Sequence, residues 1–61
     1  MFKIEYSKLF DRFNLHYNIR GSWHTFVFRY AREAERFIYS GRFTDEEEEI
    51  LIGMVHEELF E

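Results

Sequence analysis

Three histidines, His16, His24 and His56, are the side chains of this chain best suited to bind a metal ion or to transfer a proton near neutral pH. His16 and His24 could approach each other across a hairpin. No histidine is spaced four residues from another, and no pattern of two histidines and a carboxylate is legible. We therefore expect surface histidines, and neither a metal site nor a cofactor.

A hydroxyl nucleophile would need a neighbouring histidine that a third group orients. Ser22, His24 and Thr25 are close in sequence, but nothing in the pattern positions them. Paired carboxylates could act as general acid and base if one were desolvated, yet the acids cluster where a solvated helix begins. A chain of 61 residues also leaves little room for a supported cleft. The sequence predicts no enzymatic activity.

The densest charge is an unbroken acidic run made up of Asp45, Glu46, Glu47, Glu48 and Glu49. All eight Lys and Arg lie in residues 1–42 with four acids, a net charge of +4. Residues 43–61 hold the other eight of the twelve acids and no base, a net charge of −8, which gives the total of −4. Such a run is typical of a solvated helix start. It could also imitate the spaced charges of a nucleic-acid backbone and attract a basic partner.

The basic counterpart is a stripe formed by Arg29, Arg32 and Arg36, with Arg42 following. On a helix the first three would line one side and could grip phosphates, although two interleaved glutamates dilute the charge. Alternatively, these arginines pair with the acids of the last helix, within the chain or across a dimer. We favour pairing, because segments of opposite charge in one small chain attract each other.

The last helix has the clearest local signals. Thr44 and Glu47 are spaced as a capping box, so a helix is expected from about Asp45 to Glu58. Its inward side recurs at helical spacing and consists of Leu51, Ile52, Val55 and Leu59, with Met54 beside them. A second helix is expected over residues 31–40, ended by Gly41 in the left-handed conformation.

Residues 14–30 permit two interpretations. Leu15, Tyr17 and Ile19 alternate with polar residues, and a two-residue turn near Gly21 would place Phe26 and Phe28 on the same face of a hairpin. The alternative is a long amphipathic helix, whose apolar series is Trp23, Phe26, Val27, Tyr30, Ala31, Ala34, Phe37 and Ile38, with Ser22 as N-cap. We favour the hairpin, because the helix leaves the alternation before Gly21 unexplained.

At the start of the chain, Tyr6, Leu9, Phe10 and Phe13 are spaced as one helical face, capped by Ser7, although the first five residues could instead form a short strand. The expected fold is α+β: a single small domain over residues 1–61 in the order α-β-β-α-α, with a two-stranded antiparallel hairpin covered by helices. The alternative is an all-α three-helix bundle.

Size and composition set further limits. A chain of 61 residues removes only about 60% of its unfolded surface from water, and it has no cysteine for a disulfide. Thirteen aromatic residues exceed what such a domain can enclose, so a second copy or a partner could cover some of them. No apolar run is long enough to span a bilayer and the first residues lack the layout of a signal peptide, so we expect a cytoplasmic protein.

In composition the chain resembles small phage and mobile-element proteins that inhibit a host enzyme or defence complex, anti-CRISPR proteins among them. The resemblance covers no alignable segment and transfers no functional residue; it implies an inhibitor. We predict a protein-binding module for a partner with a basic surface. The expected contacts are the acidic run Asp45–Glu49 and exposed aromatics, namely Trp23, Tyr39 and Phe43. The alternatives are a dimeric nucleic-acid-binding regulator that uses the arginine stripe, and a structural subunit that folds on assembly.

Overall fold

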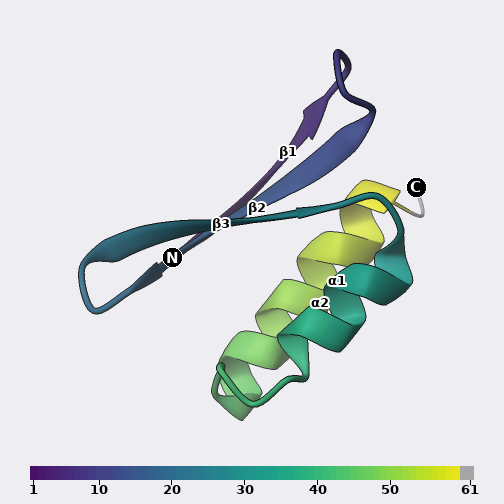
Figure 1. Ribbon diagram of the computed structural model, residues 1–61. Coiled ribbons are helices and arrows are strands. Elements are labelled where there is room, and N and C mark those ends of the chain that lie inside the picture. The colour runs from purple at the N-terminus through teal and green to yellow at the C-terminus, as the bar shows by residue number, and fades with distance from the viewer. Residues whose placement is uncertain (60–61) are drawn as a thin grey trace.

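The first half of the chain is a sheet and the second half is helical. The computed structural model describes residues 1–59, with strands β1 (Phe2–Ser7), β2 (Arg12–Ile19) and β3 (Ser22–Phe28), followed by helices α1 (Ala31–Ile38) and α2 (Asp45–Leu59). The strands form one antiparallel sheet in the order β1-β2-β3. Both helices lie together on one side of this sheet (Figure 1). The predicted α+β class is confirmed, and the all-α alternative is wrong.

The β2–β3 hairpin forms at the predicted place. Ile19 pairs with Ser22, so the turn consists of Arg20 and Gly21, both with positive φ of 52° and 85°. Two-residue turns of this hand match the twist of the strands that they join. The Gly21 N–H donates to the Asn18 side-chain oxygen at 3.0 Å, which holds the turn closed. The long-helix interpretation of this segment, with Ser22 as its cap, is therefore wrong.

The predicted N-terminal helix is wrong, and a third strand takes its place. Phe2 and Ile4 pair opposite residues of β2, and Tyr6 pairs opposite Phe13. The predicted helix would place Leu9 on the same face as Tyr6 and Phe13. Leu9 instead lies in the β1–β2 turn with 83% of its surface exposed. This segment forms a strand and not a helix, because strand alternation places its apolar side chains on the same face of the sheet as those of the hairpin.

One face of the sheet carries the core. Leu15 on the central strand is fully buried between Ile4 on β1 and Phe26 on β3. The helices cover this face with side chains at helical spacing, and the buried ones are Ala34, Ile38, Leu51 and Val55. The opposite face of the sheet is not covered by the helices (Figure 1), and it carries polar side chains together with Trp23 and Val27.

Helix α2 begins at its predicted signal, whereas α1 ends earlier than predicted. The Glu47 N–H donates to the Thr44 hydroxyl at 3.2 Å, and the Thr44 N–H donates to the Glu47 carboxylate at 2.9 Å, which is the expected capping box. Helix α1 ends at Ile38, two residues before its predicted end at residue 40, although Gly41 has the predicted left-handed conformation with a φ of 98°. In the tertiary packing α1 contacts β3, whereas α2 contacts β1 and α1. Within residues 1–59, neither helix combines the length and apolar character that crossing a membrane requires.

Phe43, expected to be exposed for a partner, is a core residue instead. Only 9% of its surface is exposed. Its ring makes edge contacts with Tyr17 at 5.4 Å, Phe37 at 6.0 Å and Phe2 at 6.0 Å between centroids. Phe43 therefore joins the α1–α2 connection to both the sheet and α1. A partner could not reach its buried ring, so the prediction that Phe43 is an exposed contact is wrong.

Two identical substitutions test this assignment of core and surface. Leu15→Ala removes a fully buried side chain and should cost about 2–5 kcal/mol of unfolding free energy in urea denaturation. Leu9→Ala, in the exposed turn, should change it by no more than about 0.5 kcal/mol. Equal losses would mean that Leu9 also packs in a core, as the helical interpretation of the N-terminus required.

Candidate functional site

The outer face of α2 carries a shallow, open groove lined by acidic and apolar side chains. Its lining residues recur at helical spacing and are Glu46, Glu49, Ile50, Gly53, Met54 and Glu57. Gly53 leaves the middle of this face without a side chain. Ile50 is 54% exposed although it is fully apolar, so part of this lining lies open to water. We call these six residues the α2 groove.

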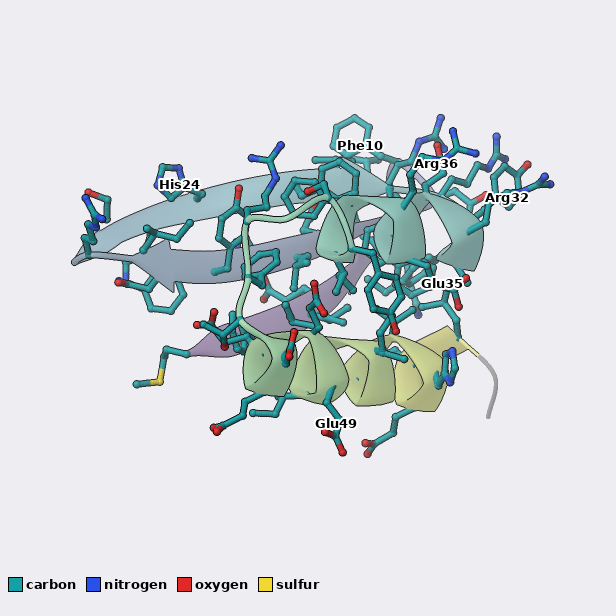
Figure 2. All side chains as sticks on the ribbon, turned by 90° about the horizontal axis from the view of Figure 1, so that it is seen from below. Phe10, His24, Arg32, Glu35, Arg36 and Glu49 are labelled. Carbon is teal, nitrogen blue, oxygen red and sulfur yellow. The ribbon has the colours of Figure 1, made fainter. Side chains whose placement is uncertain are left out.

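The acids of this groove have no basic partner among residues 1–59. The ion pairs of that part of the chain are Lys3–Glu5, His16–Glu5, Arg29–Asp11 and His56–Glu35. The expected pairing of the arginine stripe with the last helix within one chain is therefore wrong. Figure 2 shows the reason: Arg32 and Arg36 project from one side of the molecule and Glu49 from the opposite side.

The five residues of the acidic run have different roles. Glu47 caps the helix and is half-buried, as is Glu48. Glu46 and Glu49 are exposed and belong to the α2 groove, whereas the exposed Asp45 lies outside its lining. Glu57, one helical repeat further along, was not among the predicted partner contacts. Its place in the groove follows from helical spacing, because Glu57 lies four residues after Gly53 and so on the same side of α2.

The predicted aromatic contacts do not gather beside these acids. Trp23 is 57% exposed, but it alternates with the buried side of β3 and so lies on the open face of the sheet, away from the helices. Tyr39 is 59% exposed at the end of α1. The apolar component of the candidate site is instead Ile50 and Met54, which lie on α2 itself.

The arginines divide into three groups. Arg29 is paired with Asp11 at 3.1 Å. Arg32 is exposed on α1 and has no ion-pair partner within residues 1–59. Arg36 and Arg42 line a second groove between β3 and α1, whose other lining residues are Phe26, Glu33, Phe37 and Ser40.

Arg42 is held in place within this second groove. Its Nε donates to the Ser40 hydroxyl at 3.0 Å, and its guanidinium lies 4.7 Å from the centroid of the Phe37 ring. Phe26 stacks on Phe37 at 4.0 Å, so the guanidinium occupies the other face of that ring. The carboxylate of Glu33 accepts hydrogen bonds from two backbone N–H groups before α1, and these bonds lower its pKa.

A hydrogen-bonded chain that the sequence did not reveal crosses the open face of the sheet. Glu5 on β1 contacts His16 Nε2 at 2.7 Å, and His16 Nδ1 contacts the Thr25 hydroxyl on β3 at 2.9 Å. The hydrogen bond from His16, with a smaller effect of Lys3, lowers the pKa of Glu5. Glu5 and Thr25 are both exposed, so the carboxylate stays hydrated and the chain serves to tie the three strands together.

The other histidines do not combine into a metal site. His24 pairs opposite Tyr17 and lies on the face of the sheet opposite to His16, so the expected approach of these two does not occur. His56 contacts Glu35 at 3.2 Å, which links α2 to α1. Among the residues that the structure describes, no three histidine, aspartate or glutamate side chains are arranged to hold a metal ion.

Comparison with known protein families, curated proteins and solved structures finds no significant match for this chain.

Glu5 should make the stability of the protein depend on pH. Its pKa in the folded chain is below the ordinary value of 4.5, so its contribution is present above that pH and is lost as the pH falls through the folded-state pKa. Glu5→Gln should lower stability at pH 7, and its deficit relative to the natural chain should shrink as the pH falls below 4.5. Thermal unfolding over this range measures both. Glu58→Gln, at an exposed position, is the control, and its difference in stability from the natural chain should stay the same over this pH range. A stability deficit for Glu5→Gln that does not vary with pH would contradict this account.

Proposed function

We propose that this chain is a non-enzymatic protein-binding module that attaches to a basic partner surface through the α2 groove. The observation that supports this proposal is the combination of the exposed Ile50 and the half-buried Met54 with acids that have no basic partner within residues 1–59. Buried apolar contacts supply most of the binding energy of a protein interface, while charges speed encounter and select the partner. Ile50 and Met54 would be covered on binding, and Glu46, Glu49 and Glu57 would face basic side chains.

The charge of the groove acids suits a partner that normally holds nucleic acid. Glu46 and Glu49 are one turn apart, and Glu57 lies about 12 Å further along the helix axis at about 1.5 Å per residue. Carboxylates on one side of a rigid helix can imitate the negative charge of a nucleic-acid strand. In this role the protein would inhibit a nucleic-acid-handling or defence complex by occupying its basic groove, as its compositional resemblance to anti-CRISPR proteins implies.

Two charge reversals on the same helix test this proposal. Glu49→Lys lies in the α2 groove, whereas Glu58→Lys is exposed on α2 outside it and changes the net charge equally. The immobilised protein is exposed to a nuclease-treated lysate of the organism that encodes it, at low and high salt. We expect one stoichiometric protein to be retained by the natural chain and by Glu58→Lys, and to be lost with Glu49→Lys and at high salt.

Ile50→Ala supplies a second arm that leaves the charge unchanged. Truncating an apolar contact at the centre of an interface should weaken capture of the same protein without altering its salt dependence. Circular dichroism should show that each variant retains its helices. Capture that survives both Glu49→Lys and Ile50→Ala would remove the α2 groove from the proposed function.

A second function rests on the groove between β3 and α1. Arg42 is pre-oriented by Ser40 and Phe37, and its terminal N–H groups are available to a phosphate. Arg36 lies in the same groove with no ion-pair partner within residues 1–59. These observations support binding of a nucleic-acid strand to this side of the protein, although the net charge of −4 opposes it.

A mobility shift with a single-stranded oligonucleotide tests this second function. If Arg36 and Arg42 contact phosphates, replacing either with alanine should weaken binding and reduce the slope of affinity against salt concentration by about one. Arg20→Ala, in the β2–β3 turn away from the groove, should leave both quantities unchanged. Absence of a shift at low salt, or equal effects of all three substitutions, would reject this function.

A further inference from the structure

Strand β3 presents an unprotected edge. It pairs with β2 along one side only, and within residues 1–59 its other side has no strand beside it. Its sequence from Ser22 to Phe28 contains no charged residue, no proline and no glycine. Four of these seven residues are aromatic or β-branched apolar side chains that favour strands: Trp23, Phe26, Val27 and Phe28. An edge of this kind is a template on which another strand can add backbone hydrogen bonds.

The opposite edge of the sheet is protected. Strand β1 carries Lys3 and Glu5 on the open face, and these two side chains form an ion pair at 3.3 Å. Charged side chains on an edge strand discourage pairing, because a second strand would have to bring its own groups beside them. The two edges of the same sheet therefore differ, and only β3 has the composition of a pairing surface.

We propose that β3 pairs antiparallel with β3 of a second copy of this chain, about a two-fold axis at Thr25. Centring on Thr25 uses the whole strand, because three residues lie on each side of it. Thr25 then faces Thr25 of the second copy, and Trp23 faces Val27 of the second copy. Threonine pairs and pairs of an aromatic with a β-branched residue are favourable cross-strand neighbours. The two sheets become one continuous sheet with a self-complementary interface.

The two helices lie at different distances from the proposed two-fold axis. Helix α1 lies nearest to β3, and α2 lies toward β1 at the far side of the sheet. The α2 grooves of the two copies would therefore remain open, so this inference does not depend on the proposed function. Arg36 and Arg42 lie near the β3 edge, and each copy has a net charge of −4. The arginines of the two copies would repel each other, and so would the two net negative charges. Salt screens both repulsions, so association should become stronger as salt is added.

Cross-linking tests the register. The chain contains no cysteine, and residues facing each other in an antiparallel pair have Cα atoms about 4.5–5.5 Å apart, within the range that a disulfide spans. Thr25→Cys should form a covalent dimer on mild oxidation. Lys3→Cys, likewise exposed but on the β1 edge, is the control and should stay monomeric. A Thr25→Cys chain that stays reduced, or cross-links no faster than Lys3→Cys, would overturn the proposed pairing.

Sedimentation equilibrium tests the association itself. The natural chain should dimerise at micromolar concentration, with a dissociation constant that falls between about 0.05 M and about 0.5 M NaCl. Thr25→Lys sets two positive charges opposite each other and should raise that constant by at least about tenfold. Thr25→Val, which removes the same hydroxyl contact with His16, should retain the dimer. Asn14→Lys, on the open face of β2, should also retain it.

The contrary results are distinct. A natural chain that stays monomeric up to high micromolar concentration overturns the proposal. A dimer that Thr25→Lys leaves intact overturns it as well, because it must use another surface. Failure of partner capture in the α2 groove experiment would not affect either result, since that groove and the β3 edge lie on different parts of the molecule.

Discussion

The register of the β2–β3 hairpin is the constraint on which the rest of the structure depends. The turn at Arg20 and Gly21 pairs Ile19 with Ser22, and every later pair along the two strands follows from it. A shift of one residue would move Leu15 and its neighbours from the covered face to the open face. The helices, the third strand and the aromatic contacts of Phe43 all need that face, so the turn determines where the core of this small protein forms.

The same arrangement keeps the two charged segments of the chain apart. Helix α2 packs toward β1 and turns Glu46 and Glu49 outward, whereas Arg32 and Arg36 project from the other side on α1. Opposite charges that would attract each other in a flexible chain are held beyond contact, because the core fixes which side of each helix is buried. The result is a molecule with a net charge of −4 whose local surfaces have opposite signs. This separation underlies both functions proposed for the protein.

Covering one face of a three-stranded sheet with two helices also leaves surfaces that a larger domain would enclose. The Glu5–His16–Thr25 chain lies on the open face of the sheet. Strand β3 forms one edge of this sheet, and that edge is unpaired. A domain of this size buries too small a fraction of its surface to cover everything apolar, and Trp23 and Val27 remain more than half exposed. Association between copies is one way in which such a protein gains the stability that its own core cannot supply.

The sequence by itself determined the features that arise within one element or one turn. The β2–β3 hairpin, the Thr44–Glu47 capping box, the inward side of α2 and the left-handed Gly41 were all predicted, because each depends on residues a few positions apart. Tertiary structure decided the rest. Three predictions are wrong: the exposure of Phe43, the helix near residues 6–13 and the pairing of the arginines with α2. These outcomes depend on which faces meet once the strands pair, and spacing along the chain does not carry that information.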